Sequence, residues 1–347
     1  MKSMASFAAL VLVACGSATE RPTVVPTTGT TPRAPAARAC AYVTSWGGDD
    51  VCAVIVPEGR SRGCVRTGPT PHGIALSRDG ARLFVSNEGA NTITAIDTTT
   101  LRVIGEVPVG RIPNQIALSP AGDHLWVTNN GDDSVSVVDT STLAVVRTIS
   151  VGRAPHIIVT NAARNAAIIT SEGDGALDLY DLSTFERISR VPAFGYPRVV
   201  AATRAGDIAF LTLRWLNGAL VVDLSGTGPR DRVALGEVRF AKEGKDAHGI
   251  ALAPDERTLL ITTQMTDRLT FVDTTTLEVR GGITVGRNPN WVEVTPDGRV
   301  AVVSTTDDDS LSIVDIAERR VLRTVRVGKS PKRLAVGPCA KEMGEMR

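Results

Sequence analysis

The stretch Pro71-His72-Gly73-Ile74-Ala75-Leu76 decides the fold, because its pattern returns along most of the chain. The proline recurs every 42 residues, apart from one interval of 50, and an alanine takes one of the steps. The recurring positions are Pro113, Pro155, Pro197, Ala247, Pro289 and Pro331. Repeats of about 40 residues that consist of short strands are typical of β-propeller blades, so we expect that fold.

Each repeat contains four predicted strands. In residues 71–112, short apolar and β-branched runs alternate with turns rich in Gly, Asn, Asp and Thr, which favours antiparallel strands. The expected strands are residues 73–76, 82–86, 93–96 and 103–109. An aspartate follows each third strand, and we interpret this series as turn-capping rather than catalytic. Its members are Asp97, Asp139, Asp181, Asp223, Asp273 and Asp315.

Six complete copies and one split copy account for the domain. The complete copies are residues 71–112, 113–154, 155–196, 197–246, 247–288 and 289–330. For the seventh, residues 40–68 supply three strands and residues 331–338 supply the first strand. Joining the two ends leaves no free sheet edge. The sequence therefore predicts an all-β, seven-bladed propeller over residues 40–339, followed by a short tail at 340–347.

The copy at 197–246 carries the eight extra residues. Matching Gly236-Glu237-Val238 to Gly105-Glu106-Val107 places about five of them in the turn after the third strand and about three before His248. A loop on a rigid scaffold is a common place for binding. The alternative is an insertion without a function.

The N-terminus is expected to lie outside the fold. An apolar run, Phe7 to Ala14, is too short to span a membrane and is typical of an export signal, so we assign residues 1–14 to a signal peptide. It ends in Leu12-Val13-Ala14-Cys15, which resembles the bacterial lipobox and predicts lipidation of Cys15; an ordinary signal peptide is the alternative. The Thr-, Pro- and Ala-rich residues 15–39 predict a disordered tether. The domain is then expected on the periplasmic or cell-surface side of a membrane.

Several repeat motifs resemble the YVTN-repeat, YncE-like family of bacterial β-propellers. They are Tyr42-Val43-Thr44-Ser45, Trp126-Val127-Thr128-Asn129, Val135-Ser136-Val137-Val138-Asp139 and Pro296-Asp297-Gly298. The resemblance covers residues 40–338 and implies seven-bladed propellers of the bacterial surface or periplasm, some of which bind ligands or nucleic acid. It implies no single activity, because one architecture hosts many functions. The chain departs most from the pattern at Leu213-Arg214-Trp215-Leu216.

Four cysteines follow Cys15, and an even number in an exported protein indicates disulfides. In the repeat alignment, Cys339 and Cys40 flank the turn at which the split copy is interrupted, so a bond between them would close the ring. Cys52 and Cys64 fall opposite each other on the third and fourth strands. We therefore predict Cys40–Cys339 and Cys52–Cys64, in preference to a metal site, because no close Cys-x-x-Cys pair is present.

The candidate site is one mouth of the central channel, where the first strand of each blade begins. The residue after the recurring proline forms a ring of His72, Asn114, His156, Arg198, His248, Asn290 and Lys332. Basic residues precede the ring at Arg111, Arg153, Arg287 and Lys329. The acids of the loops after the second strand are expected farther out, as a negative rim: Glu88, Asp132, Asp133, Glu172, Asp174 and Asp307 to Asp309. Trp46, Trp215 and Trp291 are expected on or near the same face.

The ring permits three interpretations. Its polar groups cap strand ends and solvate the mouth; or they bind a phosphate, carboxylate or sulfate through charge-assisted hydrogen bonds; or His72, His156 and His248 hold Zn or Cu. Arg198 and Lys332 argue against a cation, so we expect no cofactor, with the metal as the lesser alternative.

We expect a monomeric, membrane-tethered binding or scaffold protein, for a small anion or another envelope protein. A net charge of +1 and 4% aromatic residues argue against a general nucleic-acid binder. The alternative is an enzyme of the lactonase or lyase type that uses the mouth histidines. Acid–base chemistry needs a histidine beside a partner, and the expected ring offers no nearby carboxylate.

Overall fold

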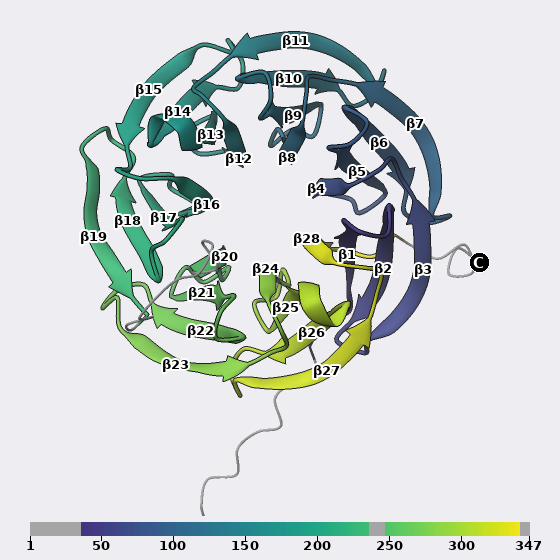
Figure 1. The fold of residues 1–347 in the computed structure, drawn as a ribbon, viewed down its shortest axis with the longest axis vertical. Coiled ribbons are helices and arrows are strands. Elements are labelled where there is room, and N and C mark those ends of the chain that lie inside the picture. The colour runs from purple at the N-terminus through teal and green to yellow at the C-terminus, as the bar shows by residue number, and fades with distance from the viewer. Residues whose placement is uncertain (1–35, 236–246, 341–347) are drawn as a thin grey trace, which may run out of the picture. The chain divides into compact units, whose positions relative to one another are not determined.

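The computed structural model describes residues 36–235 and 247–340. Their strands form seven four-stranded antiparallel sheets, which surround a central axis as the blades of a propeller (Figure 1). The predicted all-β, seven-bladed fold is confirmed. In every blade the first strand faces the axis and the fourth forms the outer rim (Figure 1). No helix in the described part of the chain has the length and apolar character needed to cross a membrane.

The strands repeat in the same order around the ring. The first strands are β4 (Pro71–Leu76), β8 (Pro113–Leu118), β12 (Pro155–Asn161), β16 (Pro197–Ala202), β20 (Ala247–Leu252), β24 (Pro289–Val294) and β28 (Pro331–Gly337). The second strands are β1 (Ala39–Ser45), β5 (Arg82–Asn87), β9 (His124–Asn129), β13 (Ala166–Ser171), β17 (Ile208–Leu213), β21 (Thr258–Thr263) and β25 (Val300–Thr305). The third strands are β2 (Asp50–Val56), β6 (Thr92–Asp97), β10 (Ser134–Asp139), β14 (Ala176–Asp181), β18 (Gly218–Asp223), β22 (Arg268–Asp273) and β26 (Ser310–Asp315). The fourth strands are β3 (Arg60–Arg66), β7 (Arg102–Pro108), β11 (Ala144–Ser150), β15 (Arg187–Pro192), β19 (Gly228–Ala234), β23 (Val279–Thr284) and β27 (Arg320–Arg326).

The hydrophobic core lies between neighbouring blades. Phe84 and Ile93 of one blade, for example, pack in one cluster with Ile116, Leu125 and Val127 of the next. Side chains alternate between the two faces of a strand, so the middle strands of a blade present apolar residues to both neighbours. This packing holds the first strands, and hence the channel wall, in fixed positions.

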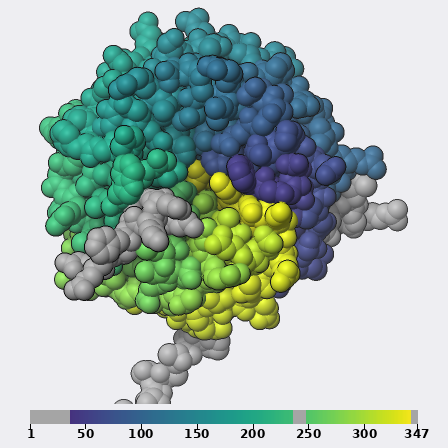
Figure 2. All heavy atoms as spheres, in the orientation of Figure 1, coloured from purple at the N-terminus to yellow at the C-terminus, as the bar shows by residue number. Residues whose placement is uncertain are grey.

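The ring is closed as predicted. The C-terminal strand β28 pairs with β1, so one sheet contains both ends of the domain, and the two segments lie in direct contact in Figure 2. Both predicted disulfides are present, Cys40–Cys339 across the closure and Cys52–Cys64 between β2 and β3.

The aspartate series caps turns. The Asp139 carboxylate accepts backbone N–H groups of Ser141 and Thr142, and Asp223 accepts that of Ser225. Side-chain hydrogen bonds from Ser141 and Ser225, followed by the backbone ones, lower the pKa of both carboxyl groups, and no substrate-facing role is needed to account for these shifts.

The predicted position of the insertion in residues 197–246 was wrong. The turn after β18 is as short as in the other blades, because Asp223 pairs with Gly228 just as Asp97 pairs with Arg102. Val233 is buried and takes the place expected for Val238, since a blade needs an apolar residue there to pack on its neighbour. All eight extra residues therefore follow β19, and most fall within 236–246, outside the described residues.

Candidate functional site at the channel mouth

The ring residue of every complete blade lies in a bulge at the start of the first strand. Pro71 pairs with Asn87, but the next pair is Ile74 with Val85, so His72 and Gly73 leave the ladder. An extra residue in one strand re-aims the side chains around it. The same shift recurs at the start of the other first strands, and it turns the residue after the proline toward the mouth.

Hydroxyl groups of the second strands fix these bulges. Ser86 Oγ accepts the Gly73 N–H at 2.7 Å and donates to the carbonyl of Asn114, the ring residue of the next blade, at 2.5 Å. The equivalent hydroxyl donates to the next ring carbonyl in six blades, from Thr44, Ser86, Thr128, Thr170, Thr212 and Ser304. These residues were missed by the sequence reasoning, although the 42-residue spacing of Ser and Thr was a signal.

The structure places all seven predicted ring residues around the mouth. Five of them are buried: His72, Asn114, His156, His248 and Asn290. The two cations, Arg198 and Lys332, are partly buried. Burial lowers the pKa of both, and the charge of Arg333 contributes to the shift of Lys332.

The three ring histidines are neutral at physiological pH. Burial, followed by the positive charge of Arg333, lowers the pKa of His72 and His156 well below 6.5, and burial followed by the charge of Arg198 does so for His248. His248 Nδ1 lies 2.7 Å from the Asn290 carbonyl oxygen, which can only accept, so Nδ1 carries the proton and Nε2 has a free lone pair.

Two carboxylates lie much closer to the ring than predicted. Glu88 Oε1 is 3.4 Å from His72 Nδ1, and Glu172 Oε1 is 3.6 Å from both His156 Nδ1 and Arg198 Nε. The backbone N–H groups of Glu88 and Glu172 donate to the carbonyls of Thr70 and Ala154, directly before the first strand of the same blade, and these hydrogen bonds hold both glutamates at the mouth. Burial raises the pKa of both carboxyl groups, and nearby cations oppose the rise. The expectation of a mouth without nearby carboxylates was wrong.

The other loop acids are occupied. Asp132, Asp174 and Asp308 pair with the basic residues that precede the ring, at Arg111, Arg153 and Arg287, over 2.5, 2.7 and 2.6 Å. Asp133 and Asp309 accept backbone N–H groups of the next blade. The three arginines therefore clamp neighbouring turns, and their side chains are about 70% exposed. Of the predicted flanking cations, Lys329 alone has no ion pair among the described residues.

Arg333 is a buried charge at the mouth that the sequence reasoning missed. Its side chain is 1% exposed, and Nε and Nη1 have no hydrogen-bond partner within the described ranges. Its guanidinium carbon lies 4.1 Å from the centre of the Trp291 ring. Burial, with the charge of Arg198, lowers its pKa to about 9. Arg333 stands one residue after Lys332, where other blades have Gly, Gln, Ile, Val or Trp, so only its departure from the repeat was a signal.

Exposed aromatic side chains gather on the mouth face. Among the described residues, the exposed aromatics are Trp46, Phe194, Tyr196 and Trp215, all in loops at this end of the blades. The Lys332 ammonium nitrogen lies 4.5 Å from the centre of the Trp46 ring, in a cation–π contact, and the indole N–H group of Trp46 donates to the Glu88 carboxylate. Tyr196 and Trp215 meet edge to face, with ring centres 5.2 Å apart. Trp291, by contrast, is buried in the channel wall.

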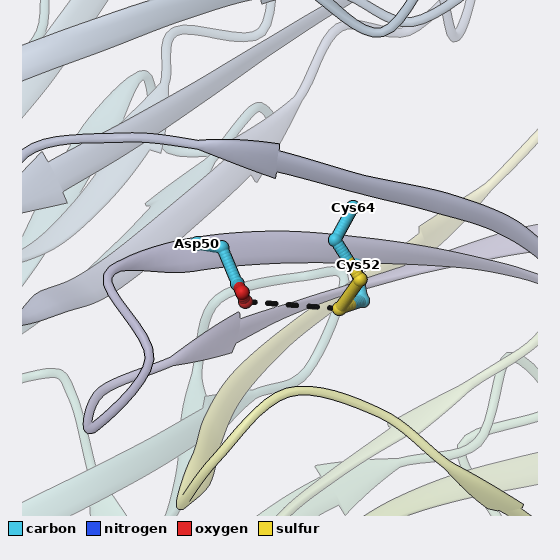
Figure 3. Close-up of side chains that lie close together, drawn as sticks. All are labelled: Asp50, Cys52 and Cys64. Carbon is cyan, nitrogen blue, oxygen red and sulfur yellow. Dashed lines mark hydrogen bonds between the residues drawn. A yellow bond between two sulfur atoms is a disulfide. The ribbon is translucent and has the colours of Figure 1, made fainter.

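A metal centre finds little geometric support. Within the described ranges, the one group of three whose ligand atoms all lie within 4.8 Å of one another is Asp50, Cys52 and Cys64 (Figure 3). Its two sulfurs form a disulfide and supply no thiolate. The centres of the His72 and His156 rings lie 6.3 Å apart. The nitrogens of the three ring histidines do not all lie within 4.8 Å of one another.

Solved structures of similar shape have diverse functions. Hydrazine synthase of Kuenenia stuttgartiensis aligns with a TM-score of 0.72 and 18% identity, over 80% of this chain and 92% of that chain. The periplasmic gluconolactonase PpgL of Pseudomonas aeruginosa aligns with a TM-score of 0.70 and 21% identity, over 86% and 99%. A protein from Lactobacillus plantarum aligns with a TM-score of 0.75 and 15% identity, over 86% and 99%. At these identities the likeness establishes the fold alone.

No protein with a curated function matches the chain. The model of the YNCE-like beta-propeller family matches residues 39–166 and 242–338, which is more than half of the sequence. These residues include the closure strands, the three ring histidines and Arg333. The chain is therefore a member of the YNCE-like beta-propeller family.

Proposed function

We propose that the chain is a binding protein whose channel mouth takes a small organic anion that carries a carboxylate or phosphate group. The observation that carries this proposal is the buried guanidinium of Arg333, whose Nε and Nη1 have no partner among the described residues. A buried charge without a partner is strongly unfavourable. An anion at the mouth would supply the missing acceptors through charge-assisted hydrogen bonds.

The surroundings of Arg333 support the same conclusion. Arg198 and Lys332 contribute two further cations, and Arg198 Nε also lacks a hydrogen-bond partner. The two glutamates balance only part of this charge. The aromatic side chains on the same face would contact the apolar part of an organic ligand, and this favours an organic anion over an inorganic ion.

Calorimetric titration of the purified protein with phosphate, citrate and gluconate tests the proposal. We expect at least one anion to bind, and Arg333→Met to weaken that binding by about tenfold or more, because a charge-assisted hydrogen bond contributes about 1.5–3 kcal/mol. Arg102→Met is the matched control, since it removes one positive charge from the exposed outer strand β7. Binding that is equal in Arg333→Met and wild type would refute the proposal.

Hydrolysis of a lactone is the second candidate function, and the His156–Glu172 pair favours it. A neutral histidine beside a carboxylate is suited to activate water, and the guanidinium groups of Arg198 and Arg333 would stabilise a developing oxyanion. Among proteins of similar fold, one is described as a gluconolactonase. Turnover of glucono-1,5-lactone that is lost in His156→Gln would establish this function in place of simple binding.

We also propose that the domain acts outside the cytoplasm. The two disulfides support export, because such bonds persist in oxidising compartments. The proposed anchor, Cys15, and most of the tether lie outside the described residues. Metabolic labelling with a fatty-acid analogue should mark the wild type and leave Cys15→Ser unmarked.

A further inference from the structure

Within the described part of the chain, one carboxyl group lines the channel cavity below the mouth. Glu293 is the fifth residue of β24, and the equivalent residues of the other first strands are small and apolar. They are Ala75, Ala117, Val159, Ala201, Ala251 and Ala335. Short side chains at six of seven positions leave the lumen open at this level. Among the described residues that line the cavity at this level, Glu293 is the one charged side chain, beside the uncharged polar side chains of Gln115 and Thr160.

The lumen at this level is a cavity of about 360 Å³. Its wall includes Ala117, Val159, Ala201 and Trp291, together with the polar side chains of Gln115, Thr160 and Glu293. Cavities of roughly this size, whose lining combines apolar side chains with a few polar groups, are typical of small-molecule sites.

Glu293 has one hydrogen-bond donor and no cation. Trp291 Nε1 donates to its Oε1 at 2.9 Å. Across the described residues, Oε2 has no partner, and no Lys, Arg or His nitrogen lies within 4.0 Å of either oxygen. Burial raises the pKa of Glu293 to about 7. Among the described residues, the ionised form of the Glu293 carboxyl group therefore has no cation as a partner near neutral pH.

Trp291 separates this carboxyl group from the mouth. The indole lies against Arg333 with its face and binds Glu293 with its N–H group. The cavity wall continues to Leu252 and Pro254. These residues lie at or just after the C-terminal end of β20, whereas His248 lies near the N-terminal end of the same strand. The cavity beside Glu293 therefore extends toward the end of the channel that lies away from the cations of the mouth.

We propose that the channel is a second ligand site, which takes a small apolar amine as its ammonium cation, with Glu293 as the counter-ion. The ammonium donates to Oε2 and to solvent, and the hydrocarbon part packs on the alanine-lined wall. The site is distinct from the anion site at the mouth in position, in charge and in ligand class.

Titration of the full-length protein with benzylammonium chloride tests this proposal. We expect binding to be about tenfold tighter at pH 8 than at pH 6, because Glu293 must ionise to pair with the cation. The strands packed against β24 are β20, β21, β25 and β28, and their titratable or charged side chains are His248, Lys332 and Arg333. The Glu293→Gln variant separates the contribution of Glu293 from theirs.

Two variants and one neutral probe make the test specific. Glu293→Gln should lose both the affinity and its pH dependence, and Ala201→Leu should weaken binding by filling the cavity while keeping the charge. Benzyl alcohol, which has the same ring without the charge, should bind more weakly than the amine at pH 8.

Equal binding of the amine to wild type and Glu293→Gln, or no binding to wild type at millimolar concentration, would overturn the proposal. Equal binding of amine and alcohol would also overturn it, because the cavity would then recognise only the ring. Anion binding at the mouth is measured in parallel. Absence of amine binding alone refutes the channel site, and absence of anion binding alone refutes the function proposed for the mouth.

Discussion

Replacement of Arg333 by methionine should make the protein more stable and less able to bind. The lowering of the Arg333 pKa to about 9 corresponds to roughly 5 kcal/mol of unfavourable free energy for the charged form. The contact with Trp291 is lost in the variant, and a desolvated cation–π contact contributes about 2 kcal/mol. Methionine keeps most of the packing of the arginine stem.

The net expectation for Arg333→Met, after allowance for relaxation around the charge, is an increase of about 1–3 kcal/mol in the free energy of unfolding. Urea unfolding at pH 7 without added anion measures this difference, and Arg102→Met on the outer strand serves as the control for a lost positive charge. A saturating anion should reverse the order, because it stabilises the wild type and not the variant. An Arg333→Met variant that is less stable than the wild type without ligand would refute the reasoning, since it would mean that the guanidinium is already satisfied.

Three further predictions concern the stability of the propeller that carries the site. Removal of Cys40–Cys339 by serine substitution should destabilise the protein by about 5–6 kcal/mol, and removal of Cys52–Cys64 by about 3 kcal/mol. The reason is that the first disulfide closes a loop of 299 residues and the second a loop of 12. Equal losses of stability in thermal unfolding would contradict this entropic explanation. Thr212→Val should cost about 1–3 kcal/mol in urea unfolding, because the Val199 N–H and the His248 carbonyl both lose their partner; an unchanged midpoint would argue against the hydroxyl links. As the pH falls from 6.5 to 5.5, the wild type should lose about 1 kcal/mol more stability than His156→Gln. The pKa of His156 is depressed in the folded state, so the unfolded chain takes up the proton first. Parallel profiles of stability against pH would show that His156 is accessible and protonated in the folded state.

The repeat made most of the fold predictable. The 42-residue spacing of the prolines identified the first strands, and the placement of the four cysteines identified both disulfides. Regularity also misled the alignment at residues 197–246, where Gly236-Glu237-Val238 resembles another fourth strand but Val233 fills the buried position. The pairing of β18 with β19 decides that placement. A match between two stretches of sequence contains no information on strand pairing.

The ring of mouth residues was predictable for the same reason, whereas its electrostatics were not. Glu88 and Glu172 are held at the ring by hydrogen bonds from their backbone N–H groups, and sequence position alone does not reveal those partners. Arg333 breaks the repeat rather than following it, so the recurring positions give no indication of its role. The ion pairs of Arg111 and Arg153 each span 21 residues, and this shared spacing was a signal that the arginines are not free.

The central claim is that the mouth holds an organic anion against Arg333. A crystal structure of the protein with the anion that binds most tightly in calorimetry tests it most directly. We predict ligand density within hydrogen-bond distance of Arg333 Nη1 and Arg198 Nε, at the level of Trp291. Density at another place, or an empty mouth at a saturating concentration of the anion, would contradict the claim.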